Sequence, residues 1–481
     1  MIDSKIRDQY TVTIGIETHV QFKTKSKLFS GADNDAREAA PNTLVNHIDF
    51  GLPGALPVLN KEAIRLATKA AFALGTEPQK FSKFDRKHYF YPDLPMGYQI
   101  SQFDEPIVLG GQLAINVEGE VKTINITRAH IEADAGKSTH PAGKDYSLVD
   151  LNRAGTPLLE IVSEPEMHTA AEAKAYAHEL YLRMRYADVS EANLYYGNMR
   201  FDVNVSVSKT DQLGTRTETK NLNSFRAVEK AVEYEVERQI EQLEKGESIV
   251  QETRGWDDAK QRTFSQRSKE NADDYRYMPD PDIPPVVLTD DYIAEVKTAM
   301  PELPDDYRAK FGGMDIDAKT IEDIIADPGT ALLTSRVFDA SGAEHARRVA
   351  FWLMRPSSDD EQAEETQALS NLDEPLIKLS QLVSDNKLSS TAAKEVLAEI
   401  LKGGTDPEQI AADKNLLQVS DEGAINEIVS KVLADNPQAA TDVKNGEMKA
   451  IGFLVGQVMK QSQGKANPAL AQELIKKQLG L

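Results

Sequence analysis

Residues 11–21 read Thr-Val-Thr-Ile-Gly-Ile-Glu-Thr-His-Val-Gln, so that apolar and polar side chains alternate along the stretch. Strict alternation predicts a β-strand with one buried and one accessible face, because successive side chains of a strand point to opposite sides. On the accessible face, Glu17 and His19 lie two residues apart and point the same way. The buried face carries Val12, Ile14, Ile16 and Val20.

Two further segments place ionisable residues on strands. Residues 200–207 alternate in the same way, and their polar side carries Arg200, Asp202 and Asn204. Residues 157–163 form a short apolar strand with a single acid, Glu160. A carboxylate among apolar neighbours needs a hydrogen-bond partner or a metal ion, since burial of an isolated charge is costly. Two interpretations stay open: polar faces that converge around Mg²⁺ and phosphate, or the solvent side of an ordinary sheet.

The densest group of ionisable residues lies between positions 128 and 166, in the runs 128–140 and 151–165, and includes Glu132 and Glu160. Within it, Ala-Gly-Lys-Ser-Thr at 135–139 is similar to the end of a phosphate-binding loop. The full motif requires glycine at position 131, which is isoleucine, and the acids that precede it would repel a nucleotide. We therefore exclude a loop of this type and expect residues 136–138 to form a turn that directs Glu132 into a metal-assisted phosphate site.

Helices interrupt and follow these strands. We expect helices at 60–74 and 224–245, each stopped by a glycine. Prolines cluster between 279 and 304 and mark a domain boundary, and the chain beyond them is helix-like, with a weaker break at 403–407. The pattern predicts an α+β fold: a mixed-sheet N-terminal domain at 1–292, an all-helical domain at 293–407 and a small helical tail domain at 408–481.

The composition excludes several classes of protein. The chain has no cysteine, which excludes a thiol nucleophile and a thiolate zinc site. No apolar run reaches about 18 residues, so we expect a cytoplasmic protein without a membrane span. The net charge of −22 argues against bulk electrostatic binding of nucleic acid, although a lysine-rich patch follows residue 441. The aromatic and basic segment 80–91 is either a base-stacking surface or core residues flanked by solvated charge.

Several motifs occur in order along nearly the whole chain: Ile14-Gly-Ile-Glu-Thr-His-Val-Gln21, Gly51-Leu-Pro-Gly-Ala-Leu-Pro57, Lys220-Asn-Leu-Asn-Ser-Phe225 and Lys449-Ala-Ile-Gly-Phe-Leu-Val-Gly456. Together they resemble the B-subunit family of the aspartyl/glutamyl-tRNA(Asn/Gln) amidotransferases. The resemblance implies a cradle-like catalytic first domain in a heterotrimeric ligase. Such a ligase uses ATP and Mg²⁺ to phosphorylate the side-chain carboxylate of glutamate or aspartate misacylated on tRNA(Gln) or tRNA(Asn). Ammonia then displaces the phosphate to form the amide.

By the same resemblance, the metal ligands are His19, Glu132 and Glu160, with Glu17 beside them as a ligand or an orienting acid. Lys87 and Asp202 join them as catalytic residues. Arg200, Asn204 and Lys220 would shape the nucleotide and acyl site, where cations stabilise phosphate charge. In the basic tail, Lys460 and Lys465 would bind tRNA.

The chain has neither a cysteine that could act as a glutaminase nucleophile nor a glycine- and serine-rich amidase signature, so ammonia must come from a partner. The resemblance identifies this partner as the A subunit, a glutaminase, with the C subunit clasping the pair. Two rival functions remain. The first is a tRNA-binding scaffold whose catalytic pocket has decayed, and the intact acidic residues argue against it. The second is a stand-alone nucleotide-dependent carboxylate ligase, which would lack an ammonia source.

The chain departs from the family pattern in two places. Many relatives carry four zinc-binding cysteines at the positions of Ser30, Ala32, Asn46 and Asp49, so we expect no zinc. Relatives often have a lysine around Met96, which puts one polar position of the ammonia channel in doubt.

Overall fold

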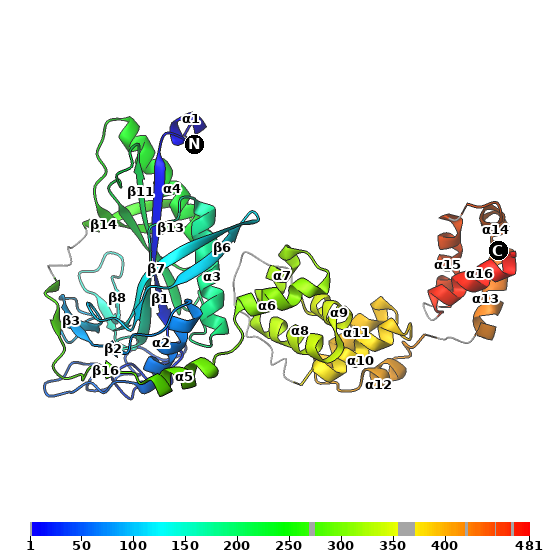
Figure 1. Ribbon diagram of the computed structural model, residues 1–481, viewed down its shortest axis with the longest axis horizontal. Coiled ribbons are helices and arrows are strands. Elements are labelled where there is room, and N and C mark those ends of the chain that lie inside the picture. The colour runs from blue at the N-terminus through cyan, green and yellow to red at the C-terminus, as the bar shows by residue number, and fades with distance from the viewer. Residues whose placement is uncertain (1, 269–274, 355–370, 419–421, 448, 463–465) are drawn as a thin grey trace. The chain divides into compact units, whose positions relative to one another are not determined.

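The computed structural model describes residues 2–268, 275–354, 371–418, 422–447, 449–462 and 466–481. They form two compact units, the first ending at Pro304 and the second beginning at Asp305. A large sheet with helices makes up the first unit, and the second is helical (Figure 1). This arrangement confirms the α+β class expected from the sequence.

The first unit is built on a nine-stranded sheet. Its strand order is β14-β13-β12-β11-β1-β10-β7-β5, and β6 pairs with β7. Neighbouring strands are antiparallel except β12 and β13, which run parallel. The strands are β1 (Thr11–Gln21), β5 (Val108–Leu109), β6 (Gln112–Val117), β7 (Glu120–Ala133), β10 (Pro157–Ser163), β11 (Met199–Ser208), β12 (Thr217–Leu222), β13 (Glu252–Asp257) and β14 (Arg262–Ser268).

The central strand β1 has the alternation that the sequence predicts. Its apolar side chains Val12, Ile14, Ile16 and Val20 are buried in the core of the first unit. Helices α3 (Ala170–Tyr186) and α4 (Phe225–Glu244) pack on each other and on strands of this sheet (Figure 1). Thr169 and Ser224 fix where these helices begin, because their hydroxyl groups accept hydrogen bonds from backbone N–H groups of the first turn. The apolar face of the sheet is thereby covered, and the polar face lies opposite.

Smaller elements surround the sheet. They are α1 (Ser4–Arg7), α2 (Lys61–Ala73), the pair β2 (Phe81–Ser82) and β16 (Val286–Val287), the sheet of β15 (Met278–Pro279), β3 (Asp85–His88) and β4 (Tyr98–Ser101), and the pair β8 (Lys137–Thr139) and β9 (Leu148–Asp150). The prediction of a turn at 136–138 was wrong, because Lys137 and Ser138 are extended and pair with β9. Gly136 immediately precedes this strand and packs closely against the backbone of Asp150 and Asp93. Its N–H donates to the carbonyl oxygen of Asp93 at 2.8 Å.

Segment 80–91 is divided between its two interpretations. Phe84 is buried and packs edge-on against Phe29, with ring centroids 5.4 Å apart. By contrast, Phe81, Phe90 and Tyr91 are between 44 and 74% exposed. Phe84 therefore belongs to the core, whereas Phe81, Phe90 and Tyr91 lie on the surface.

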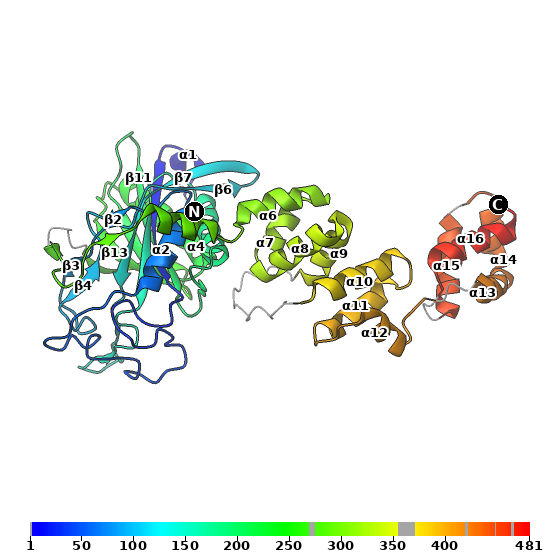
Figure 2. The same ribbon diagram turned by 60° about the horizontal axis from the view of Figure 1, so that its bottom comes forward.

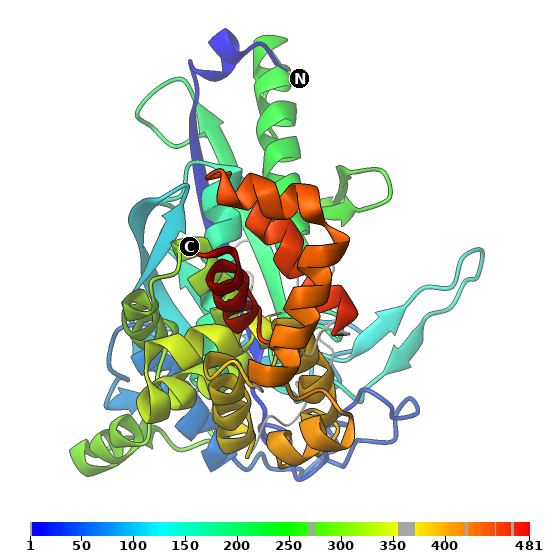
Figure 3. The ribbon, with the colours of Figure 1, turned by 90° about the vertical axis from the view of Figure 1, so that its right-hand side faces the viewer.

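Helix α5 (Asp290–Thr298) contacts α2 in the first unit, and the predicted boundary after residue 292 falls inside it. The second unit consists of helices, shown from two further directions in Figures 2 and 3. Helices α13 to α16 surround a core of their own that includes Val429, Leu454 and Leu474. None of the described helices combines the length and the apolar character needed to cross a membrane. The helices are α6 (Pro304–Phe311), a 3₁₀ turn (Gly312–Met314), α7 (Ala318–Ile325), α8 (Pro328–Ser341), α9 (Ala343–Leu353), α10 (Asp373–Ser384), α11 (Ser390–Ile400), α12 (Pro407–Asp413), α13 (Glu422–Asp435), α14 (Pro437–Lys444), α15 (Lys449–Gln461) and α16 (Pro468–Leu479).

Candidate functional site

The candidate site is a row of ionisable side chains that crosses four neighbouring strands. In the sheet register, His130 of β7 faces Glu160 of β10, Glu160 faces His19 of β1, and His19 faces Arg200 of β11. Directly opposed residues lie on the same side of a sheet, so these four side chains share one face. Glu17 faces Asp202 in a second row on this face. The sheet thus brings together residues that are up to 185 positions apart along the chain.

Two of these side chains, His19 and Glu160, and Glu132 of β7, two residues after His130, approach one another closely. Nε2 of His19 lies 3.6 Å from Oε1 of Glu132 and 3.4 Å from Oε2 of Glu160. One donor atom from each of the three residues lies within 4.8 Å of the other two. Two carboxylates and one imidazole at such distances are ligands that a divalent cation accepts.

The charges of this cluster are strongly coupled. Burial alone would raise the pKa of Glu160, but the neighbouring His130 and His19 hold that pKa well below its usual value. Burial of His19 would lower its pKa, yet the hydrogen bond and the charge of Glu160, helped by Asp202 and Glu132, raise it to about 9. Without a bound cation, a protonated His19 therefore compensates the carboxylates around it.

Glu17 stands beside the cluster rather than in its closest part. It accepts a hydrogen bond from the Asn204 side chain at 3.0 Å. Burial, and then the negative charges of Glu160, Glu218 and Asp202, raise the pKa of Glu17. This carboxyl group therefore takes up a proton more readily than an exposed glutamate does.

The buried Asp202 forms an ion pair with the partly exposed Lys220 next to Glu17. The ammonium of Lys220 lies 3.1 Å from Oδ2 of Asp202 and 3.5 Å from Oε1 of Glu218. The backbone N–H of Asn221 donates to Oδ1 of Asp202 at 2.7 Å. Although burial opposes ionisation of both partners, the attraction between them lowers the pKa of Asp202 and raises that of Lys220.

Arg200 and Lys87 supply two cations near the cluster. Arg200 donates to Oδ2 of Asp134 at 3.3 Å, and Arg153 lies 3.0 Å from the same oxygen. Lys87, on β3, places its ammonium 4.9 Å from the centroid of the Tyr275 ring. Burial opposes the charge of Lys87, but the carboxylates of Glu132 and Glu160 raise its pKa. All the predicted site residues of the first domain thus gather around one sheet face.

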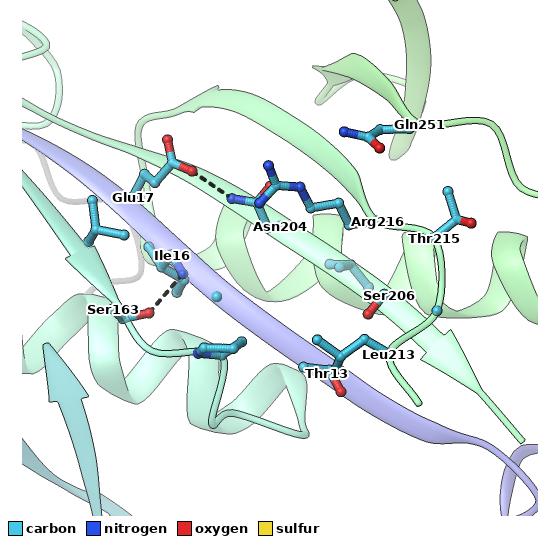
Figure 4. Close-up of a pocket in the computed structure, with 15 residues that line it drawn as sticks. Thr13, Ile16, Glu17, Ser163, Asn204, Ser206, Leu213, Thr215, Arg216 and Gln251 are labelled. Carbon is cyan, nitrogen blue, oxygen red and sulfur yellow. Dashed lines mark hydrogen bonds between the residues drawn. The ribbon is translucent and has the colours of Figure 1, made fainter. Parts of the chain in front are cut away.

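A cavity of about 500 Å³ continues this face beyond Glu17 and Asn204. Small residues of β1 and β11, Gly15 and Ser206, lie along it, and the segment 213–216 closes one side. Figure 4 shows the guanidinium of Arg216 extending from this segment toward the hydrogen-bonded pair of Glu17 and Asn204. The cavity is large enough for a ligand of drug or nucleoside size.

Sequence reasoning missed three residues of this site: His130, Asp134 and Glu218. The first two follow a signal in the sequence, because residues 128–134 alternate; β7 places His130 and Glu132 on one face, and Asp134 comes directly after its last residue. We interpreted this run as an approach to a turn, which hid the alternation. The sequence gives no such signal for Glu218, because this residue reaches the site only through the pairing of β12 with β11.

Comparison with known proteins agrees with the geometry. The model of the GatB/GatE catalytic domain matches residues 12–294, and that of the GatB domain matches residues 337–479. The aspartyl/glutamyl-tRNA(Asn/Gln) amidotransferase B subunit of Alkalilimnicola ehrlichii is 47% identical over 98% of this chain and 99% of its own length. The proteins of the same name from a Thermoanaerobacter species and Geobacillus kaustophilus are each 45% identical over the same shares of both chains. The chain belongs to the GatB family.

Ser30, Ala32, Asn46 and Asp49, the four positions considered for zinc in the sequence, belong to a hydrogen-bonded network. Asp49 accepts from Ser30 Oγ at 3.1 Å and from the backbone N–H of Asn46 at 2.9 Å. The ammonium of Lys27, which is fully buried, lies 3.5 Å from Asp49 and lowers the cost of burying that carboxylate. Ala32 contributes its backbone carbonyl oxygen, which accepts from the N–H of Lys27 at 3.0 Å. Met96 lies nearby and lines a small cavity with Phe29 and Tyr98.

Of the two lysines expected to bind tRNA, one lies among the described residues. Lys460 is exposed in the last turn of α15. Lys465 lies outside the described residues. Among the described residues, the prediction for the tail therefore depends on Lys460 of α15. Two further lysines of the tail, Lys476 and Lys477, lie in the last turn of α16.

Proposed function

We propose that this chain is the kinase and transamidase subunit of a glutamine-dependent carbon–nitrogen ligase. It would phosphorylate the side-chain carboxylate of glutamate or aspartate misacylated on tRNA(Gln) or tRNA(Asn), at the expense of ATP. Ammonia would then replace the phosphate, which yields Gln-tRNA(Gln) or Asn-tRNA(Asn). The observation that carries this proposal is the cluster of His19, Glu132 and Glu160 on the polar sheet face of a GatB-family chain.

The cluster fits a magnesium ion. Its donors are two carboxylates and one imidazole, and those of Glu132 and Glu160 are oxygen atoms, which Mg²⁺ prefers. Mg²⁺ held by these three residues would neutralise part of the negative charge of ATP. We assign Glu17 the role of orienting acid, because it accepts from Asn204 and stands beside the three ligands.

The cations around the cluster would position two anionic substrates, the triphosphate and the carboxylate. Lys87 faces the charges of Glu132 and Glu160 and would stabilise a phosphate there. Arg200 and Lys220 would act with it, while Asp202 keeps Lys220 in place. The cavity beyond Asn204 would take the nucleoside of ATP, which places its phosphates toward the cluster.

Partners would supply the rest of the reaction. We propose that an A subunit produces ammonia from glutamine, that a C subunit holds the pair together, and that the assembly works in the cytoplasm. The helical part would divide into a middle domain at 293–407 and a tRNA-binding tail at 408–481, with Lys460 and Lys465 in the interface. The absence of cysteine in the chain supports an external source of ammonia.

Replacement of Glu132 by glutamine tests this function in the assembled trimer. With misacylated tRNA, ATP and Mg²⁺, Glu132→Gln should abolish amide formation, even when ammonium replaces glutamine, because the side chain loses its charge but keeps its size. Glu120→Gln, at an exposed position of the same strand, serves as the control. Full activity of Glu132→Gln with ammonium would refute the assigned cluster. Assays with both misacylated tRNAs would establish which is amidated.

A further inference from the structure

His130 occupies a place in the candidate site to which no role has yet been assigned. It lies on β7 directly opposite Glu160, and only 4% of the residue is exposed. Its Nε2 atom is 3.4 Å from Oε2 of Glu160 and 3.8 Å from Oε2 of Glu132. One imidazole nitrogen therefore contacts both carboxylates of the cluster at once.

His130 and His19 both face Oε2 of Glu160 at 3.4 Å, but they approach the carboxylate of Glu132 from different sides. Nε2 of His19 faces Oε1 of Glu132, whereas His130 and the hydroxyl group of Ser101 face Oε2 of the same residue. Among the described residues, the set whose donor atoms all lie within 4.8 Å of one another includes His19 but not His130. His130 is thus placed to hold the carboxylates from the side, while His19 completes the ligand set.

The hydrogen-bonding capacity of His130 supports this distinction. Carboxylate oxygens accept hydrogen bonds, so Nε2 of His130 can hold both of them in the tautomer that carries its hydrogen on this nitrogen. Its other nitrogen, Nδ1, is buried and has no hydrogen-bond partner within the part of the chain that the structure describes. The ring therefore directs its polar contacts to Glu132 and Glu160 alone.

We propose that His130 is a positioning residue that orients the carboxylates of Glu132 and Glu160 toward a divalent cation held by them and His19. The inference rests on the proposed function, since it concerns the cation of that site. Groups that orient metal ligands usually change metal affinity by about 10–100-fold when they are removed. A residue that only fills space would leave that affinity unchanged.

The test is direct titration of the purified full-length chain with Mn²⁺, followed by electron paramagnetic resonance, with thermal unfolding as a second readout. His130→Leu removes the donor, and His130→Gln restores an N–H group near the position of Nε2. We expect about 10–100-fold weaker Mn²⁺ binding for the leucine variant and binding within about threefold of the parent for the glutamine variant. His140→Leu, at an exposed histidine, controls for the loss of an imidazole.

Each outcome decides the matter. Unchanged Mn²⁺ affinity in a folded His130→Leu chain overturns the inference, as does equal loss in the leucine and glutamine variants. If the leucine variant does not fold, His130→Asn replaces it, because the shorter amide cannot reach both carboxylates. His19→Ala separates the two levels of the argument: if the parent chain binds no Mn²⁺, or His19→Ala binds it as well as the parent, the assigned cation site fails. If the His130 variants bind Mn²⁺ normally while His19→Ala does not, the assigned cation site is supported and the positioning role of His130 is refuted.

Discussion

Binding of a divalent cation should displace a proton from His19, and this can be measured as a steep pH dependence of affinity. The carboxylate of Glu160 and its neighbours raise the pKa of His19 to about 9 against the opposing effect of burial. A metal coordinates only the neutral imidazole. At pH 7 about one chain in a hundred has a neutral His19, so Mn²⁺ affinity should rise about tenfold per pH unit from pH 7 and level off near pH 9.

Isothermal titration calorimetry at pH 7.5, in two buffers with different ionisation enthalpies, measures the proton directly. We expect release of about one proton for each Mn²⁺ bound. His19→Gln, whose amide does not titrate, should bind more weakly and lose the slope. An affinity that stays constant between pH 7 and 8.5, or proton release near zero in the parent chain, would refute the reasoning.

The sign of the stability effect follows from the same raised pKa. Without cation, the protonated imidazole stabilises the folded chain fully below its unfolded value of 6.5, and this contribution is lost as the pH rises through about 9. Saturating Mn²⁺ should therefore reduce the fall in melting temperature between pH 8 and 10.

Three further predictions concern other parts of the molecule. Asp49→Leu should leave the buried Lys27 without its counter-charge and lower the free energy of unfolding by about 3–5 kcal/mol. Urea denaturation should show most of this loss regained in the double variant with Lys27→Met. Arg216→Ala should raise the KM for ATP with little change in that for tRNA, and an equal effect on both would remove Arg216 from the nucleotide pocket. Lys460→Ala should weaken tRNA binding and reduce the salt slope by about one, whereas an unchanged slope in filter binding would exclude a phosphate contact.

The alternation along the strands was enough to predict much of the site. It correctly placed Glu17 with His19, and Asp202 with Arg200, on polar strand faces. It could not predict which strands are neighbours, because β1 pairs with β10 and β11, and both lie far along the chain. Strand order and register, which depend on packing of the whole core, decide that His19 meets Glu160.

Other features depend on tertiary contacts that leave little periodic signal. The cavity beside Asn204 needs the segment 213–216 and Gln251 to approach the sheet from separate parts of the chain. The strand at 137–139 was mistaken for a turn because Gly136 and Lys137 suggested a break. A glycine there instead allows close approach to the backbone of Asp150, where an added Cβ would lie 2.9 Å from a carbonyl oxygen.

The cations near the candidate site differ in whether they form ion pairs. On the polar face, Lys220 is committed to Asp202 and Glu218, and Arg200 is committed to Asp134. Within the described residues, neither Lys87 nor Arg216 forms an ion pair within 4 Å.

These two cations face different carboxylates of the polar sheet face. Lys87 lies near Glu132 and Glu160, and Arg216 extends toward the pair of Glu17 and Asn204 (Figure 4). An unpaired cation beside buried carboxylates gains most from an anion, because charge interactions are stronger where water is excluded. If ATP binds as proposed, with its nucleoside in the cavity, its phosphate chain would gain most from a position between these two side chains, with the terminal phosphate next to Lys87.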